Sequence, residues 1–291
     1  MLGVLVGLVC AASWAGGSVL LRDLSKKLDP FTLNAPRAIT GGLAIFLLAL
    51  VTGQTQGYRQ VTGDKLLLMI ASIGLGGGIG DAFYISSIAR IGVSRAFPIS
   101  STYPAFTLLV SFIFLQEEIT PALVVGLVVI TAGVLLISGP STEEEGDVDP
   151  VTGKGGVWLA LLASLCWAAS MTMIAPGIEG LNSIMVASIR TPALALMLSG
   201  VVAMRNTLPQ LRQLTKKEWL TLIVGGLIGW GLGSLLFVAT VALLGPTRAA
   251  ILTSTSPLFA LPMSVTLLKE RVKPIVLAGT ALTVLGVILV S

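Results

Sequence analysis

Asp81 is the acidic side chain that lies well inside an apolar stretch of this sequence, within GLGGGIGDAFYISS (74–87). An ionised aspartate at the centre of a lipid bilayer costs about 2.5 to 3.5 kcal/mol, so such residues usually mark a pathway or a partner. Three roles therefore fit Asp81. It is a group that takes up and releases protons, a counter-charge for a cationic ligand, or one half of a structural ion pair with Arg37 or Arg190.

Arg37 and Arg190 also lie several residues inside apolar stretches. A guanidinium can hold a carboxylate through two parallel hydrogen bonds, so both are candidates for binding a carboxyl group of a ligand. The alternative is a guanidinium that reaches an interface or an internal partner and fixes its helix in place. Glu117 and Glu270, at the ends of two other apolar stretches, are interpreted as structural.

Two runs of hydroxyl side chains with a proline, SSTYPAF (100–106) and TSTSPLF (253–259), occur in stretches long enough to cross a membrane. Proline frees a backbone carbonyl, which hydroxyls can satisfy where the backbone is buried in protein or lines a watery cavity. The alternative is a kink that only shapes packing. The cavity candidates are Ser101, Thr102, Tyr103 and Pro104 in the first run and Ser254, Thr255 and Pro257 in the second.

Four more aromatic residues are candidates for the walls of such a cavity, because aromatic faces suit amphiphilic or cationic ligands. For the tryptophans, ordinary packing is an equally good interpretation. The glycine clusters GLGGGIG (74–80) and GGLIGWGLG (225–233) are interpreted as sites of close helix packing. The aromatic candidates are Trp14, Tyr84, Trp167 and Phe237.

Several classes of chemistry are excluded or disfavoured. The chain has no histidine, which rules out a His-based triad, an HExxH zinc site and an imidazole proton relay. Cys10 and Cys166 are interpreted as small buried hydrophobes. Gly78 to Asp81 spell GxGD, a pattern of presenilin-like intramembrane proteases, but an aspartic mechanism needs a second carboxylate, and the other acidic residues fall in loops or at helix ends. We expect no metal, no cofactor, no nucleic-acid partner and no enzymatic activity.

Composition fixes the environment of these residues. The chain is 54% hydrophobic and 11% charged, with a mean hydropathy of +0.95, which predicts an all-helical membrane protein with many spans. The first span lacks a basic n-region and a cleavage site, so we expect a permanent helix. Stretches of about 17 to 25 residues, the length that crosses a bilayer, predict ten spans at 2–21, 31–52, 66–89, 96–115, 119–138, 156–175, 183–203, 219–243, 248–268 and 274–290.

The sequence contains an internal repeat with an offset of 153 residues. It predicts one half at 1–138, an acidic linker at 139–155 and a second half at 156–291. Five spans in each half is an odd number, so the halves should be inverted in the membrane, as in many secondary transporters. Asp81 maps to Ser234, so that charge is not duplicated. The matching pairs are Trp14/Trp167, Arg37/Arg190, Gly80/Gly233, Arg95/Arg248, Pro104/Pro257, Glu117/Glu270, Pro121/Pro274 and Gly133/Gly286.

These repeats resemble the EamA-type repeat of the drug/metabolite transporter superfamily. The resemblance covers essentially the whole chain and is most specific in the hydroxyl-proline helices and the segments LQEEITPALVVGLVVITAGVLL and LKERVKPIVLAGTALTVLGVIL that follow them. It implies a ten-helix carrier of the inner or plasma membrane that exports amino acids, other small metabolites or drugs. It also implies a central cavity built by spans 1, 3, 4, 6, 8 and 9, with spans 5 and 10 at the periphery.

The basic residues predict an orientation. Of 18 in total, Arg37 and Arg190 lie inside spans, three (Arg59, Lys65 and Arg248) lie in one set of alternate loops, and the other thirteen lie in the opposite set. The positive-inside rule then predicts both termini outside, although relatives are usually drawn with termini inside.

Together these features predict a secondary transporter that moves small organic metabolites across the cytoplasmic membrane by alternating access, as a monomer or homodimer. Asp81 is the candidate for proton coupling. The alternatives are multidrug efflux of cationic lipophilic compounds and, least favoured, a GxGD-type protease.

Overall fold

The computed structural model of the chain describes residues 1–21, 24, 27–91, 96, 99–137, 150–268 and 274–290, and every regular element in these ranges is a helix. Six helical stretches are long and apolar enough to cross a membrane, and shorter apolar helices accompany them. Four of the six are single helices, namely α1 (Leu2–Leu21), α2 (Pro30–Val51), α8 (Pro150–Ile178) and α9 (Ser183–Met204).

The other two long stretches each contain a π-helical segment. One runs from α3 (Gly63–Ile73) through η3 (Gly74–Gly80) into α4 (Asp81–Ile91). The second runs from α11 (Lys216–Gly226) through η4 (Leu227–Gly233) into α12 (Ser234–Leu244). π-helical turns are rare and occur often at functional sites. Both fall on the glycine clusters of the sequence.

The remaining helices are shorter. They are the 3₁₀ helix η2 (Gln54–Gln60), α6 (Tyr103–Leu115), α7 (Pro121–Ile137), α10 (Leu208–Arg212), α13 (Pro246–Thr253), α14 (Ser256–Leu268) and α15 (Pro274–Val290). Asp29 caps α2, because its side chain accepts hydrogen bonds from the backbone N–H groups of Phe31 and Thr32, and Pro30 occupies the first turn.

The structure differs from the predicted spans at three places. The stretches predicted at 96–115 and 248–268 are not single helices, because the chain makes a turn at residues 101–102 and again at 254–255. A proline two residues after each turn lies in the first turn of a new helix, where its fixed φ and missing N–H are tolerated. Helix α8 begins at Pro150, so the end of the predicted linker is helical. Residues 139–149, Arg95 and Glu270 lie outside the described part of the chain.

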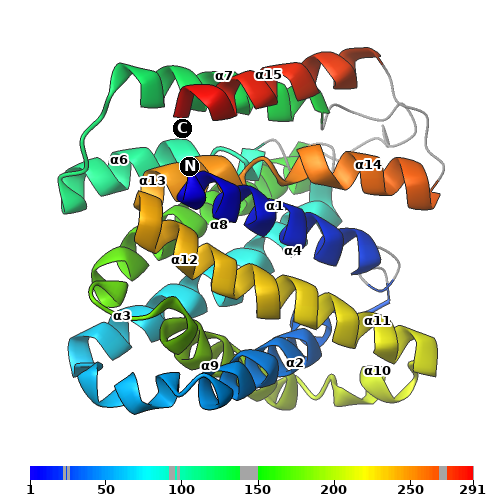
Figure 1. The fold of residues 1–291 in the computed structure, drawn as a ribbon. Coiled ribbons are helices and arrows are strands. Elements are labelled where there is room, and N and C mark those ends of the chain that lie inside the picture. Colours follow the sequence, from blue (N-terminus) through cyan, green and yellow to red (C-terminus); the bar gives the residue numbers. More distant parts are fainter. Residues whose placement is uncertain are drawn as a thin grey trace.

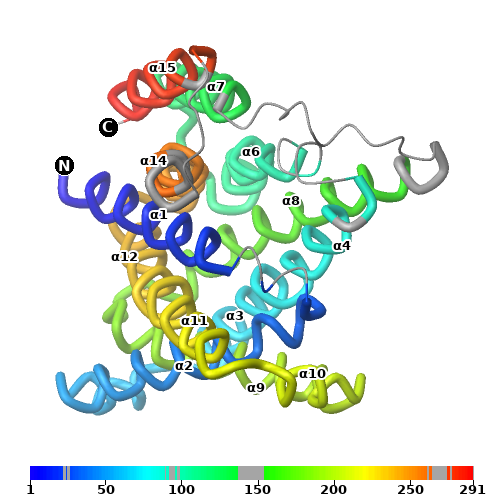
Figure 2. The backbone as a smooth tube through the Cα atoms, turned by 90° about the vertical axis from the view of Figure 1, so that its right-hand side faces the viewer, coloured from blue at the N-terminus to red at the C-terminus, as the bar shows by residue number. Residues whose placement is uncertain are grey.

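The helices form a bundle with two paired edges (Figures 1 and 2). Helices α7 and α15 lie side by side at one edge, over α6 and α14, and α2 and α9 lie side by side at the opposite edge. Helices α1, α4, α8 and α12 cross the middle. The start of α1 and the end of α15 lie near one another in both views.

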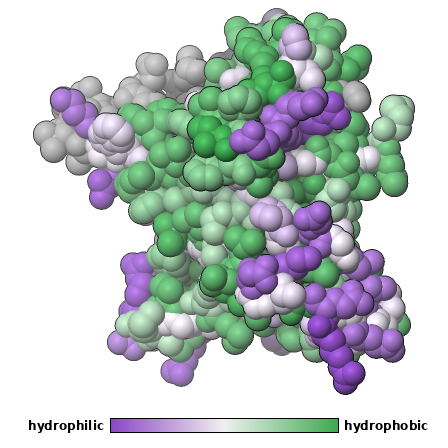
Figure 3. Space-filling model, turned by 90° about the vertical axis from the view of Figure 1, so that its left-hand side faces the viewer, coloured by the Kyte–Doolittle hydropathy of each residue, from purple (hydrophilic) through white to green (hydrophobic). Residues whose placement is uncertain are grey.

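The surface is as apolar as a bilayer requires. Large hydrophobic side chains are exposed along the outer helices, including Phe112, Ile113 and Phe114 of α6 and Leu277 and Ile288 of α15. In Figure 3, hydrophobic residues cover most of the face shown and hydrophilic residues gather in separate clusters. Exposed patches of this extent fit contact with lipid.

Candidate functional site

A cavity of about 420 Å³ lies in the middle of the bundle. Residues of α1, α2, the α3–η3–α4 stretch, α6, α8, α9, the η4–α12 stretch, α13 and α14 line it, whereas α7 and α15 contribute none of its described lining residues. Eleven of the residues predicted from the sequence line this cavity, namely Trp14, Arg37, Asp81, Tyr84, Ser101, Tyr103, Trp167, Arg190, Phe237, Ser254 and Pro257.

Three predicted residues are not among the lining residues. The hydroxyl of Thr102 donates to the carbonyl of Ile99 at 2.7 Å and lies 3.0 Å from the Ser164 hydroxyl. Pro104 is buried in the first turn of α6. The hydroxyl of Thr255 donates to the carbonyl of Leu252 at 2.7 Å, so it is occupied by its own backbone.

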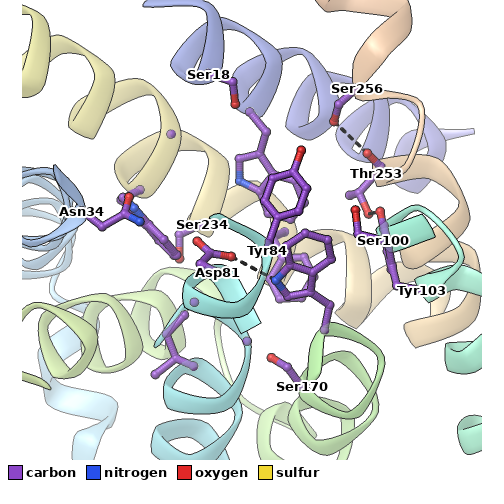
Figure 4. A pocket seen from close by; sticks show the side chains of 18 of the residues that line it. Ser18, Asn34, Asp81, Tyr84, Ser100, Tyr103, Ser170, Ser234, Thr253 and Ser256 are labelled. Atoms are coloured by element: carbon purple, nitrogen blue, oxygen red, sulfur yellow. Dashed lines mark hydrogen bonds between the residues drawn. The ribbon is translucent and has the colours of Figure 1, made fainter. Parts of the chain in front are cut away.

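Asp81 is the first residue of α4 and directly follows the π-helical segment η3. Its Oδ1 accepts a hydrogen bond from the indole Nε1 of Trp167 at 3.0 Å (Figure 4). The absence of a side chain at Gly80 allows this approach, because a β-carbon there would lie 2.9 Å from Cδ1 of Trp167. The glycine that precedes Asp81 therefore positions the tryptophan that donates to it.

The same close approach occurs in the second half of the chain. A β-carbon at Gly233 would lie 2.6 Å from Cδ1 of Trp14, and Ser234 follows Gly233 as the first residue of α12. The hydroxyls of Ser234 and Thr191 lie 2.9 Å apart. The position equivalent to Asp81 thus pairs with a neighbouring hydroxyl.

Aromatic rings form two groups in the cavity. Trp167 lies between Tyr84, at 5.2 Å between ring centroids, and Tyr103, at 5.8 Å. Trp14 and Phe237 lie 5.7 Å apart. Tilted and edge-to-face rings at these separations attract one another and offer apolar surface to a bound molecule.

The two arginines have different surroundings. Arg37 donates from Nη1 to the Asn34 side-chain oxygen at 2.6 Å and interacts electrostatically with Asp81. Arg190 is almost completely buried, with 1% of its surface exposed. Its Nη2 donates to the Ser72 hydroxyl at 3.2 Å, and its guanidinium lies 5.5 Å from the centroid of the Phe237 ring.

The two broken helices meet at the cavity. The hydroxyl of Tyr103, at the start of α6, donates to the carbonyl of Ala250 at 3.1 Å and lies 3.2 Å from the Thr253 hydroxyl. Ser254 and Ser256 donate to the backbone carbonyls three residues before them, at 2.7 and 2.8 Å. Hydroxyls near the proline therefore satisfy backbone carbonyls, as expected of irregular backbone beside a cavity.

Sequence reasoning missed several lining residues. Asn34 precedes Arg37 by one helical turn, so the i, i+3 spacing of two polar residues in an apolar stretch was an available signal. Ser100, Thr253 and Ser256 lie in the two hydroxyl-proline runs, so the signal that pointed to their neighbours was available for them too. Ser18, Ser170 and Trp230 carry no such signal, because serines and apolar residues are common in membrane helices. Figure 4 labels several of these residues. Among the described residues, no cluster of three metal-binding side chains is present.

Comparisons with known proteins give consistent results. The EamA-like transporter family matches the chain twice, over residues 1–139 and 154–291. An uncharacterized transporter of Archaeoglobus fulgidus is 28% identical over 289 residues, which cover 99% of this chain and 98% of the relative. Protein LicB of Haemophilus influenzae is 25% identical over 295 residues, covering 99% and 97%.

Two further comparisons extend this picture. The glucose uptake protein GlcU of Staphylococcus xylosus is 28% identical over 242 residues, covering 80% of this chain and 76% of the relative. A protein of known crystal structure superposes with a TM-score of 0.81 at 18% identity, covering 99% of this chain and 95% of its own, which establishes a shared fold.

Proposed function

Since the chain belongs to the EamA-like transporter family, we propose that this membrane transporter moves small organic metabolites, such as amino acids, out across the cytoplasmic membrane by alternating access. The observation that supports this most directly is the central cavity, in which charged and aromatic side chains face a space of about 420 Å³. This volume lies within the usual range for small-molecule sites, about 300 to 1,000 Å³.

Ten spans in two inverted halves are part of the proposal. The family pattern matches each half once. The π-helical segments begin 153 residues apart, at Gly74 and Leu227, and the helix breaks at 101–102 and 254–255 have the same offset. Discontinuous helices at corresponding positions of two repeats are typical of secondary transporters, whose binding sites lie between the repeats, and this supports the proposal.

Asp81 is the proposed coupling group. It lines the cavity, and one of its oxygens accepts from an indole rather than from a lysine or arginine. A carboxylate in this setting can take up a proton when the cavity faces the acidic side and release it on the other side.

The test is transport by the purified protein in proteoliposomes. Radiolabelled amino acids, other metabolites and glucose are offered with and without an imposed pH gradient, for the native chain, Asp81→Asn and the control Asp64→Asn. Asp64 is an exposed residue in the first turn of α3. We expect gradient-driven transport in the native chain and the control and its loss in Asp81→Asn. Coupled transport that survives in Asp81→Asn would remove Asp81 from the coupling role, and no transport of any compound would contradict the proposal.

Two other substrate classes are kept because specific observations favour them. GlcU is named a glucose uptake protein, which favours a sugar. The aromatic rings beside Asp81 favour a cationic lipophilic compound. The protease interpretation of the GxGD pattern is disfavoured, because members of this family are transporters.

A further inference from the structure

We propose that Arg190 binds a carboxylate of the transported molecule, so that the substrate is an organic anion with an apolar, ring-sized body. This inference rests on the proposed transport function and names the chemistry of its substrate. It is carried by the surroundings of Arg190 in the cavity.

Arg190 is a buried cation that lacks a carboxylate partner. It lines the cavity with 1% of its surface exposed. Within the described part of the chain, no acidic oxygen lies within 4 Å of its nitrogens, and Nε and Nη1 have no hydrogen-bond partner. An unpaired buried charge is costly, and a guanidinium with free N–H groups is compensated best by a carboxylate.

The charges of the cavity also favour an anionic ligand. Its described lining contains two guanidinium groups and one carboxylate, Asp81. Asp81 interacts electrostatically with Arg37, which also holds the Asn34 side chain. When all three groups are ionised, the cavity carries one excess positive charge. A ligand with one negative charge would neutralise the site.

The body of the ligand follows from the rings beside Arg190. The guanidinium lies 5.5 Å from the centroid of Phe237, and Phe237 lies 5.7 Å from Trp14. A molecule whose carboxylate reaches Arg190 would therefore place its apolar part against these two rings. Ring contacts of this kind suit an aromatic or branched apolar group.

Binding can be measured without transport. Phenylacetate and its uncharged analogue phenylacetamide are titrated at neutral pH into the purified full-length protein in detergent. The intrinsic tryptophan fluorescence, to which the lining residues Trp14, Trp167 and Trp230 contribute, is followed. Phenethylammonium tests the opposite charge. We expect saturable binding of phenylacetate, with affinity for the amide and the cation weaker by about tenfold or more, since the loss of one hydrogen bond between two charged groups changes an affinity by at least that factor.

Two variants test whether Arg190 causes the preference for the carboxylate. Arg190→Gln should lose the preference for phenylacetate over phenylacetamide, and Arg190→Lys should retain part of it. Arg205→Gln is the matched control, because Arg205 is an exposed residue at the end of the same helix, α9. An unchanged preference in Arg190→Gln would overturn the assignment.

The native protein provides a test even if Arg190→Gln does not fold. Equal binding of phenylacetate and phenylacetamide, or stronger binding of phenethylammonium, would refute the anion site. The outcome is separable from that of the transport assay. Binding of the carboxylate without uptake of any compound would refute the transport proposal alone, and transport of sugars or cations without carboxylate binding would refute this inference alone.

Discussion

Replacement of Gly80 by alanine tests whether the approach of Trp167 to Asp81 depends on a missing side chain. A β-carbon at Gly80 would lie 2.9 Å from Cδ1 of Trp167, 3.0 Å from Nε1 and 3.1 Å from Cβ of Cys166. Real β-carbons do not approach this closely, so the indole must move. The hydrogen bond from Nε1 to Asp81, now 3.0 Å long, lengthens or breaks.

The matched control is Gly78→Ala, two residues earlier in the same π-helical segment, where a β-carbon would have no neighbour within 4 Å. Both substitutions change glycine to alanine within one helix, so the backbone contribution of about 1 kcal/mol is shared. Overpacking costs typically about 1 to 3 kcal/mol. We therefore expect Gly80→Ala to be less stable than Gly78→Ala by about 1 to 3 kcal/mol.

The assay is reversible unfolding of the purified protein in mixed micelles with increasing sodium dodecyl sulfate, followed by circular dichroism. Transport in proteoliposomes with an imposed pH gradient is the second measurement, and Gly80→Ala should reduce it more than Gly78→Ala does. Equal stability and equal transport for the two variants would refute the reasoning, because the proposed contact between Gly80 and Trp167 would then carry no energy.

Three further predictions concern packing and helix ends. Gly133→Ala should destabilise the contact between α7 and α15, because its β-carbon would lie 2.7 Å from a backbone carbonyl oxygen of α15. Gly200→Ala is the control and should not destabilise the protein in this way, because a β-carbon there would have no neighbour within 4 Å. Unfolding in mixed micelles compares the stability of the two variants. Thr215→Ala removes the capping box of α11 and should cost roughly 0.5 to 2 kcal/mol in the same assay. Thr247→Val removes the 2.6 Å hydrogen bond to Glu117 that joins the start of α13 to the α6–α7 connection, and protease cleavage at that connection should become faster.

The all-helical class and most helix positions were predictable, because apolar stretches of membrane-spanning length leave few alternatives. The predicted bounds of the first, second and seventh spans differ from α1, α2 and α9 by at most one residue. The sequence predicted one continuous helix at 96–115 and another at 248–268, so the breaks at 101–102 and 254–255 were not predicted. A proline in an apolar stretch is compatible with a kink or a break, and the neighbouring helices decide between them.

Lining residues of the candidate site were predictable where their chemistry is unusual for a membrane interior. Asp81, Arg37 and Arg190 were named because buried charge is costly, and all three line the cavity. Thr102 and Thr255 were named because they belong to the two hydroxyl-proline runs, but they are not among the lining residues, and their hydroxyls donate to nearby backbone carbonyls. Which way a hydroxyl points depends on local backbone geometry, which a sequence pattern does not contain.

The π-helical segments also change how the side chains of these stretches should be mapped. A π-helical turn bonds residue i to i+5, so it accommodates one residue more than an α-helical turn. In an α-helix, each residue turns the direction of the side chain by about 100°. A helical-wheel projection drawn with a constant step through residues 63–91 would therefore misplace Asp81 and Tyr84 relative to Met69 and Ser72. Because η3 accommodates an extra residue, the loss of one glycine there can be absorbed by a return to α-helical turns, whereas the loss of one residue within α3 would rotate the side chains that follow by about 100° relative to those before it.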